Sequence, residues 1–237
     1  LSLRGNFNED DCFEISYYYP YFCGNKISTT EQVDIEKHAE KESYAGVCDE
    51  VRLGVTLIFY LQNVSDYLAV KHNKIYQSKA QGTILAALST EGKVLLPISK
   101  DEKNKKFNEQ SNNERNHLIA AARSGDEDAI ENLTLEDMDT YSLLSRRILH
   151  EDIMSIVDSY FMPYGIESDQ YSILGEITGC KLLQNKMTEE NVYALEIKCN
   201  DIEFPVCINQ KDILGEPAVG RRFKGNIWLQ GSIRYQE

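Results

Sequence analysis

The residues best suited to binding chemistry lie on the last predicted strand, which runs from residue 223 to residue 233. Alternation along this strand places Lys224, Asn226, Trp228 and Gln230 on one outward face. An exposed indole with polar neighbours is typical of a platform on which a base, a sugar or a peptide stacks. Aromatic side chains also serve as packing surfaces, and the alternative is that the predicted central helix covers this face. The sequence leaves both alternatives open.

A short basic group, Arg221, Arg222 and Lys224, lies at the start of the same strand. Together with Trp228 it would form a surface for single-stranded nucleic acid. The formal net charge of -13 opposes this alternative, because an acidic protein repels a phosphate backbone. We therefore predict that nucleic acid is a disfavoured ligand. We predict that a ligand or protein partner is bound by Trp228, Arg221, Arg222, Lys224 and Gln230.

Metal-binding and catalytic patterns are weak. His38 lies between Glu36 and Glu40 in an alternating stretch, so the three side chains would share one face of a strand and could ligate a metal. Alternating charges are also the ordinary solvated face of a sheet. The six cysteines form no CxxC or CxxH pair, and the common phosphate-loop, dinucleotide, hydrolase, zinc-protease and EF-hand motifs are absent. We therefore predict no catalytic residue, no metal ligand and no cofactor.

Pairs of acidic residues keep an enzyme as the alternative function. The pairs are Asp10 with Asp11, Glu151 with Asp152, and Glu167 with Asp169. They would support acid–base catalysis only where the fold brings two carboxylates into one cleft. In a chain with 38 acidic residues such pairs also arise by chance.

Composition indicates a soluble cytoplasmic protein. The 237 residues are 42% hydrophobic and 27% charged, and no apolar run is long enough to cross a bilayer. Several cysteines fall among apolar residues in predicted strands, as reduced core thiols do in the cytosol. Exposed strand edges make another protein or a second copy a plausible partner.

The order of elements predicts an α+β fold, with antiparallel sheets around a helical middle segment. Four stretches in the first part have strand patterns: 12–21 with one buried face, 33–38, 51–62, and 82–98, which divides into a hairpin at Thr90-Glu91-Gly92. We predict an N-terminal antiparallel β-rich domain over residues 1–98. The polar residues 99–116 predict a linker.

The third part, residues 117–237, is predicted to be a helical segment followed by a β-rich C-terminal domain. A short helix over 117–122 ends at Gly125, and Asp126 caps a second one. Thr134 and Asp137 match a capping box, which predicts that the central helix starts there. Residues 152–162 favour an extended segment, with a helix as the alternative.

Three strand patterns follow in the C-terminal part. Residues 171–184 predict a long bent strand, and the arms 193–199 and 202–208 predict a hairpin that turns at Asn200-Asp201. With the glycine-containing last strand they favour a curled sheet or a small β-barrel.

Two long phrases and three shorter ones carry a family resemblance. They are NLTLEDMDTYSLLSRRI with SIVDSYFMPYGIESDQYSILGEI, CNDIEFPVCINQKDILGEPAVGRRFKGNIWLQG, EISYYYPYF, HAEKESYAGVCDE and VRLGVTLIFYLQN. In these phrases, and over most of its length, the chain resembles an uncharacterised family of cytosolic proteins from clostridial gut bacteria. The family is defined as a domain of unknown function, so the resemblance implies no activity and no catalytic residue. It does imply a further N-terminal segment before Leu1.

The predicted function is therefore that of a non-catalytic cytosolic binding or interaction protein. Its C-terminal β-rich part is expected to bind another protein or a small ligand.

Overall fold

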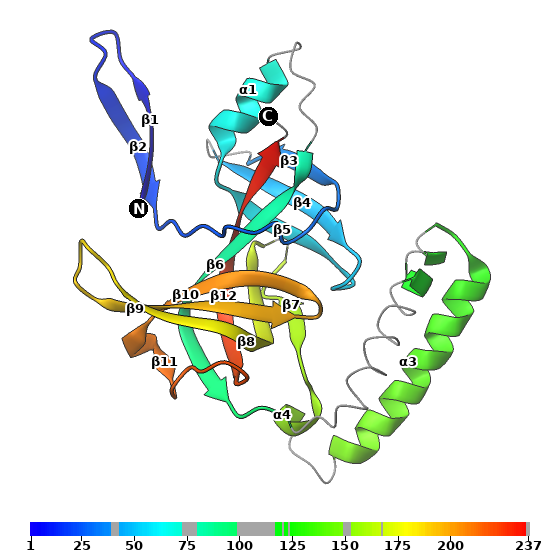
Figure 1. The fold of residues 1–237 in the computed structure, drawn as a ribbon. Coiled ribbons are helices and arrows are strands. Elements are labelled where there is room, and N and C mark those ends of the chain that lie inside the picture. Colours follow the sequence, from blue (N-terminus) through cyan, green and yellow to red (C-terminus); the bar gives the residue numbers. More distant parts are fainter. Residues whose placement is uncertain are drawn as a thin grey trace.

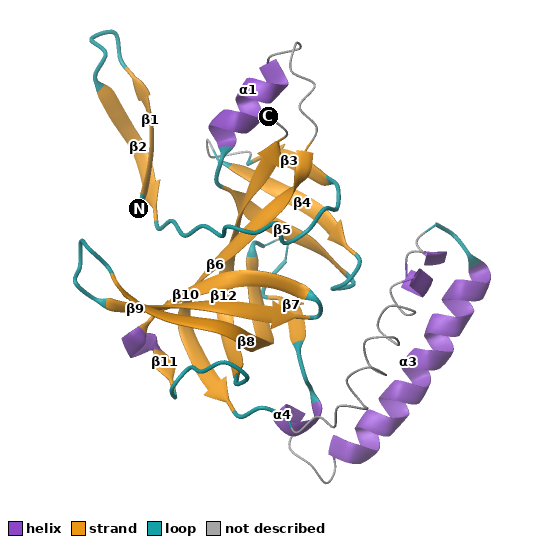
Figure 2. Ribbon diagram, in the orientation of Figure 1, coloured by secondary structure: helices purple, strands orange, loops and turns teal. Residues whose placement is uncertain are grey.

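The computed structural model describes residues 1–38, 43–72, 80–98, 117–119, 121–122, 124–148, 153–166 and 168–235. Strands predominate, and the fold is mostly β (Figure 2). The strands are β1 (Ser2–Phe7), β2 (Phe13–Tyr19), β3 (Val33–Lys37), β4 (Tyr44–Glu50), β5 (Val55–Leu61), β6 (Ala80–Leu95), β7 (Tyr160–Pro163), β8 (Gln170–Gln184), β9 (Asn191–Cys199), β10 (Ile202–Asn209), β11 (Ile213–Leu214) and β12 (Arg222–Tyr235). The helices are α1 (Val64–His72), α3 (Glu127–Ile148) and α4 (Ile153–Ile156), with a 3-10 turn η1 (Gln210–Asp212).

Ten strands form one mixed sheet in the order β11-β6-β10-β9-β8-β12-β5-β4-β3, with β7 beside β8 (Figure 1). Most neighbours are antiparallel, but β12 with β5, and β6 with β10 and β11, are parallel. Because β12 also pairs with β6, the strands β6, β10, β9, β8 and β12 form a partial ring. The predicted antiparallel pairs, helical middle segment and curled C-terminal sheet are present, whereas the sheet as a whole is mixed and does not close into a barrel.

The longest pairing in the sheet, between β6 and β12, holds it together. The two strands pair along their whole length, from Ala80 with Tyr235 to Leu95 with Arg222. The strand β6 precedes residues 99–116 and β12 follows them, so strands from both predicted β-rich domains share one sheet. The predicted linker itself lies outside the described residues.

The predicted hairpin at Thr90-Glu91-Gly92 is wrong, because β6 is a single strand of 16 residues. In its pairing with β12, Glu91 lies opposite Asn226 and Ser89 lies opposite Ile227, so Thr90 is an extra residue. The local turn signal is thus accommodated as a β-bulge, which bends the strand. Pairing with a long neighbouring strand outweighs the local preference for a turn.

The predicted hairpin around Asn200-Asp201 is confirmed. Both residues have positive φ, 45° and 66°, and the flanking Cys199 and Ile202 pair directly. Positive φ at both central positions matches the twist of the flanking strands. The bend predicted in β8 is also present, as a bulge between Ile177 and Gly179.

The core lies on the inner faces of the ring strands and of β5. The apolar residues predicted to point inward from β12 are buried: Phe223, Ile227, Leu229 and Ile233. Gly231 is needed among them, because a Cβ there would lie 2.5 Å from the ring of Phe59. Strand β5 is shorter than predicted, since residues 51–54 form a turn.

A hairpin of β1 and β2 projects from the sheet (Figure 1). The prediction that residues 12–21 have one buried face is correct only at the base, where Tyr19 is 6% exposed. Nearer the tip, Phe13 and Ile15 are 43% and 55% exposed. Because β2 pairs with β1 in a separate two-stranded sheet, its distal half does not join the core.

The long helix α3 begins at Glu127 and contacts α4 (Figure 1). Asp126 caps it as predicted, since its Oδ1 accepts a hydrogen bond from Ala129 N at 3.1 Å. The predicted new start at Thr134 is wrong, because the helix continues and the Thr134 hydroxyl donates to the Ile130 carbonyl one turn back. Within residues 152–162 the structure has both alternatives, α4 and then the start of β7.

Candidate functional site

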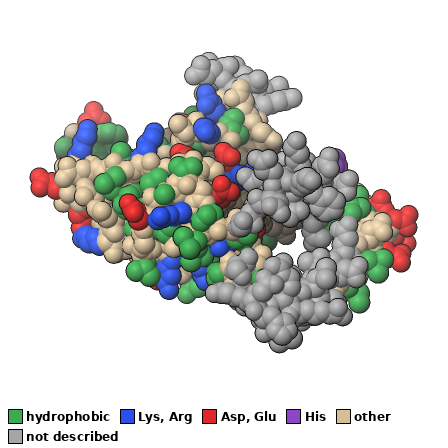
Figure 3. All heavy atoms as spheres, turned by 60° about the horizontal axis from the view of Figure 1, so that its bottom comes forward, with side chains coloured by type: hydrophobic (Ala, Val, Ile, Leu, Met, Phe, Trp, Pro, Cys, Tyr) green, Lys and Arg blue, Asp and Glu red, His purple; other side chains and the backbone are tan. Residues whose placement is uncertain are grey.

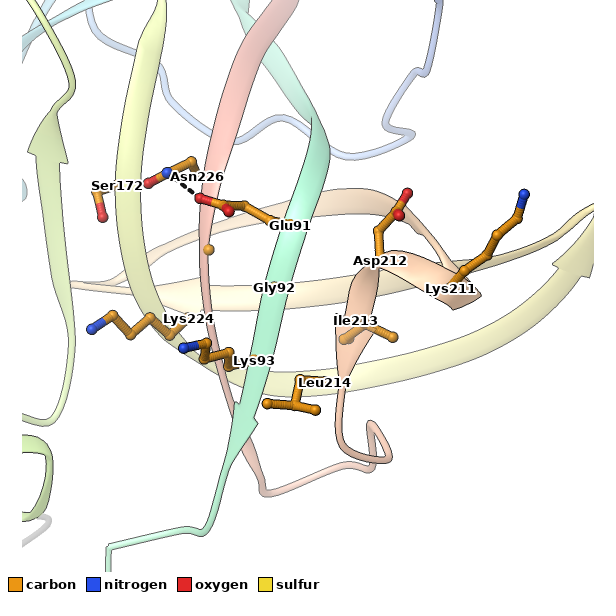
Figure 4. Close-up of a pocket in the computed structure, with 11 residues that line it drawn as sticks. Glu91, Gly92, Lys93, Ser172, Lys211, Asp212, Ile213, Leu214, Lys224 and Asn226 are labelled. Atoms are coloured by element: carbon orange, nitrogen blue, oxygen red, sulfur yellow. Dashed lines mark hydrogen bonds between the residues drawn. The ribbon is translucent and has the colours of Figure 1, made fainter.

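A pocket of about 450 Å³ opens on the outer face of the sheet, where the end of β6 meets the start of β12 (Figure 4). Strand β8 borders it on one side, and β11 with η1 borders it on the other. Such a volume is in the range of small-molecule sites. Its lining comprises Glu91, Gly92, Lys93, Ser172, Lys211, Asp212, Ile213, Leu214, Lys224, Gly225 and Asn226.

Two lysines face each other across the pocket floor. Lys93 of β6 and Lys224 of β12 are direct cross-strand partners, and Figure 4 shows both ammonium groups extending to the same side of β12. Like charges directly opposite in a sheet are destabilising. Within the described ranges neither lysine forms an ion pair, and Lys224 Nζ donates a hydrogen bond to the Met154 thioether at 4.0 Å.

The third lysine of the lining is engaged elsewhere. Lys211 forms an ion pair with Glu190, and in Figure 4 its side chain points away from the other two lysines. The hydrogen bond from Lys211 lowers the pKa of Glu190 and, in return, raises the pKa of Lys211. The charge of Lys211 is therefore already compensated, and Lys93 and Lys224 remain as the uncompensated pair.

Two glycines fix the backbone beneath the lysine pair. Gly92 and Gly225 are cross-strand partners, and a Cβ on Gly92 would lie 2.4 Å from the ring of Phe223. A Cβ on Gly225 would lie 2.7 Å from the Glu91 carbonyl oxygen. The missing side chains let Phe223 fill the inner side of the sheet directly below the lysines.

An apolar border flanks the charges. Leu214 of β11 pairs with Lys93, and Leu174 of β8 pairs with Lys224, so the four residues form one row across four strands. Leu174 is fully buried and does not line the pocket, so Leu214 supplies the apolar surface. Leu214 is 68% exposed. A ligand with an acidic group and an apolar portion would fit this row.

Two carboxylates also line the pocket, but they do not converge. Glu91 accepts a hydrogen bond from Asn226 Nδ2 at 2.6 Å, and Asp212 lies across β6 from it (Figure 4). The pair of converging carboxylates that an acid–base enzyme needs is not formed by these residues.

The predicted stacking residue Trp228 is half-buried and held by neighbours. Its Nε1 donates to Asp169 Oδ2 at 2.6 Å, and its ring lies 5.3 Å from that of Tyr60 and 6.2 Å from that of Tyr19. Residues of β5 and of the projecting hairpin thus contact the indole, where the sequence predicted either an open platform or a covering helix. Asp169, predicted as half of an acidic pair with Glu167, serves as the acceptor, and Glu167 lies outside the described residues.

The two predicted arginines bind backbone carbonyls. Arg222 is 6% exposed and donates to the carbonyls of Leu96, Val157 and Met154 at 3.0, 2.8 and 2.8 Å. Burial lowers the pKa of its guanidinium, and the carbonyls replace the lost water. Arg221 donates to the Glu216 carbonyl. On the face shown in Figure 3, basic side chains are interspersed with hydrophobic and acidic ones, so the single basic surface that nucleic acid requires is not visible there.

Gln230 was predicted to face outward, and this is wrong, since it is fully buried. Its Oε1 accepts from Gln62 Nε2 at 2.8 Å, and its Nε2 donates to the Pro20 carbonyl at 2.8 Å. The chain after β2 crosses the sheet here and covers Gln230. Of the five predicted residues, Lys224 is therefore the one that lines the pocket.

The comparison with known proteins identifies the family. Residues 1–231 match the family model described as "Domain of unknown function, E. rectale Gene description (DUF3881)". The chain belongs to the DUF3881 family. No curated protein and no solved structure matches this DUF3881 chain.

Among the described residues of this DUF3881 chain, no group of three potential ligands is placed to hold a metal ion. Glu40, part of the weighed metal cluster with His38, lies outside those residues, as do Glu151 and Asp152. No helix in the described part is long and apolar enough to span a membrane.

Sequence reasoning missed Lys93, because residues 90–92 were interpreted as a turn. A signal for Lys93 was nevertheless present in the residue order, which is Gly92-Lys93 in one strand and Lys224-Gly225 in the other. When these two strands pair in antiparallel register, Lys93 lies opposite Lys224, and Gly92 lies opposite Gly225.

Proposed function

We propose that this DUF3881 chain is a binding protein that holds an anionic group between Lys93 and Lys224. The observation that supports this most is the uncompensated cross-strand lysine pair in the floor of the pocket. A bound anion would replace a repulsive contact by two attractive ones. The proposal keeps the predicted non-catalytic binding role and narrows it to one place on the sheet.

The positive charge of the two lysines supports the proposal, although the chain as a whole is acidic. With a net charge of -13, most of the surface repels anions, so two adjacent lysines without acidic partners are unusual in this chain. The exposed Leu214 adds apolar area beside the charges, and the Ser172 hydroxyl adds a hydrogen-bond donor. Binding energy would therefore come from charge and from apolar contact together.

The arrangement favours binding over acid–base catalysis. Glu91 is held by Asn226, and Asp212 lies on the other side of β6 (Figure 4). We further propose that the protein acts in the cytoplasm. Burial raises the pKa of the Cys48 and Cys199 thiols to about 12, and all six cysteines are free, which suits a reducing compartment.

Thermal unfolding in the presence of two anions, inorganic phosphate and citrate, tests the proposal. The wild-type chain is expected to gain stability as either anion is added, because a ligand that binds only the folded state raises the unfolding temperature. The double variant Lys93→Gln/Lys224→Gln should lose most of this gain. Lys181→Gln, an exposed lysine of β8 away from the pocket, is the matched control and should keep it. Equal gains in all three proteins would refute the proposal.

A further inference from the structure

Among the described residues, the contacts that anchor the projecting β1–β2 hairpin to the sheet lie near its base. Arg4 donates to the Gln62 carbonyl and to the Tyr19 hydroxyl, and the Tyr19 ring packs at a tilt against that of Tyr60, with centroids 4.7 Å apart. Figure 1 shows the turn of the hairpin pointing away from β11 and from the end of β6, where the lysine pocket lies. The tip is therefore far from the pocket of its own chain.

The tip carries both acidic and apolar groups. Glu9, Asp10 and Asp11 form the turn. Directly beneath it, the rings of Phe7 and Phe13 pack in a tilted arrangement with centroids 5.3 Å apart, and the two residues are 69% and 43% exposed. Large exposed aromatic side chains next to one another mark an interaction surface.

The turn presents its acids on a defined backbone. Asn8 Oδ1 accepts hydrogen bonds from the backbone N–H groups of Asp10 and Cys12, at 3.0 and 2.9 Å. Asn8 N also donates to the Cys12 carbonyl at 3.0 Å. A loop held in this way loses little conformational entropy when it docks.

We infer that the acidic tip of one copy of the chain docks into the Lys93–Lys224 pocket of a second copy. This inference rests on the proposed function, because it names the source of the anionic group. The carboxylates of Glu9, Asp10 and Asp11 complement the two lysines, and the Phe7–Phe13 pair complements the exposed Leu214. Each copy has one tip and one pocket. Two copies therefore form a closed dimer when the tip of each docks into the pocket of the other.

Charge selects this occupant over the other macromolecules. An acidic tip repels nucleic acid and anionic lipid surfaces. A partner for it needs cations beside apolar side chains, and the pocket of a second copy has this combination in Lys93, Lys224 and Leu214. Of the two carboxylates in the lining, Glu91 is hydrogen-bonded to Asn226, and Asp212 lies across β6 from it (Figure 4). The lysine pair gains counter-charges in the same contact.

Sedimentation velocity of the full chain over a range of concentrations tests the inference. The wild type is expected to self-associate. The tip variant Glu9→Gln/Asp10→Asn/Asp11→Asn and the pocket variant Lys93→Gln/Lys224→Gln should each dissociate at concentrations at least about tenfold higher, since loss of a few charge pairs changes affinity by such factors. Lys181→Gln should behave as the wild type.

Mixing the two variants gives the decisive result. The tip variant keeps an intact pocket, and the pocket variant keeps an intact tip. At a concentration at which neither variant self-associates, a mixture with one partner labelled should therefore form a heterodimer through its one intact tip–pocket contact. A monomeric wild type, or a mixture that stays monomeric, overturns the inference. If the monomer still gains stability from citrate through Lys93 and Lys224, the proposed function stands without this partner; if no anion acts through the lysines, both are lost.

Discussion

Lys93 and Lys224 are direct cross-strand partners in β6 and β12, and the described residues supply neither with a carboxylate. A row of Leu214, Lys93, Lys224 and Leu174 crosses four strands at this point. Sheets ordinarily place opposite charges or apolar pairs in such positions. The departure from that pattern locates the candidate site.

Removing one lysine should stabilise the protein when no anion is present. We expect Lys93→Gln to raise the free energy of unfolding by about 0.5 kcal/mol in dilute buffer, because it removes a like-charge contact. The gain should shrink as salt screens the repulsion. Urea unfolding at low and high salt measures it, with Lys181→Gln as the control. A loss of stability in Lys93→Gln at low salt would contradict the uncompensated pair.

The ion pair between the buried Glu50 and the partly exposed Arg52 should control stability at low pH. Glu50 is fully buried, and Arg52 binds both of its carboxylate oxygens at 2.8 Å. Burial by itself raises the pKa of Glu50, but the hydrogen bonds from Arg52 and Thr29 outweigh burial and leave the pKa below its ordinary value of 4.5.

Since this folded-state pKa is lowered, the stabilising contribution of Glu50 is present above pH 4.5 and is lost as the pH falls through the folded-state pKa. Glu50→Gln should cost about 3 kcal/mol at neutral pH, because Arg52 loses its buried partner. It should also flatten the decrease in stability on acidification. Urea unfolding from neutral to acidic pH measures both effects. An unchanged acid profile in the variant would show that Glu50 is not the group responsible.

The Tyr171 hydroxyl hydrogen-bonds to the backbone of β5 at Ile58, beyond the residues at which β5 pairs with β12. This hydroxyl accepts from Ile58 N at 2.7 Å and donates to the Ile58 carbonyl at 3.1 Å. Tyr171→Phe should therefore cost about 2 kcal/mol, because both backbone groups lose their partner. Tyr164→Phe, at a residue that is 57% exposed, is the control.

Alkaline pH provides a second test of Tyr171. Burial raises the pKa of this phenol to about 12, from an ordinary value of 10.0. Its contribution to stability is therefore complete below pH 10 and is lost as the pH rises toward 12. Unfolding curves across this range should be steeper in pH for the wild type than for Tyr171→Phe. Parallel curves would contradict the assignment.

The one tryptophan reports whether the hairpin is docked. Tyr19 of β2 contacts Trp228, so Tyr19→Ala should expose the indole and shift its fluorescence emission to longer wavelength. Tyr18→Ala changes the opposite face of β2, at a residue that is 69% exposed, and should leave the emission unchanged. Equal spectra in both variants would show that the hairpin base does not cover Trp228.

Local patterns in the sequence predicted the parts of the fold that depend on neighbouring residues. The turn at Asn200-Asp201 and the alternation of β12 are of this kind, because each is determined within one hairpin or one strand. The continuity of β6 depends on its pairing with β12, more than a hundred residues away in sequence, so the local turn signal at Thr90 was misleading. The length of β2 was predicted, but its exposure depends on the absence of a second layer behind its tip.

Only part of the candidate site could be predicted, because the rest also depends on contacts between residues far apart in the sequence. Lys224 was included because its own strand places it outward, whereas Lys93 belongs to the site only through cross-strand pairing. Gln230 and Arg222 were placed outside because alternation does not show that the chain after β2, or the carbonyls around α4, will bury them.

Assignment of the backbone amide resonances, followed by titration with citrate, tests the central claim most directly. An anion held between Lys93 and Lys224 should shift the amide signals of Gly92 and Gly225 in a saturable manner, because both glycines lie beneath the lysines. Gly179, in the bulge of β8 and outside the pocket, should not shift. The same titration of Lys93→Gln/Lys224→Gln should leave Gly92 and Gly225 unchanged. Saturable shifts that persist in this variant, or that are confined to other regions, would contradict the account.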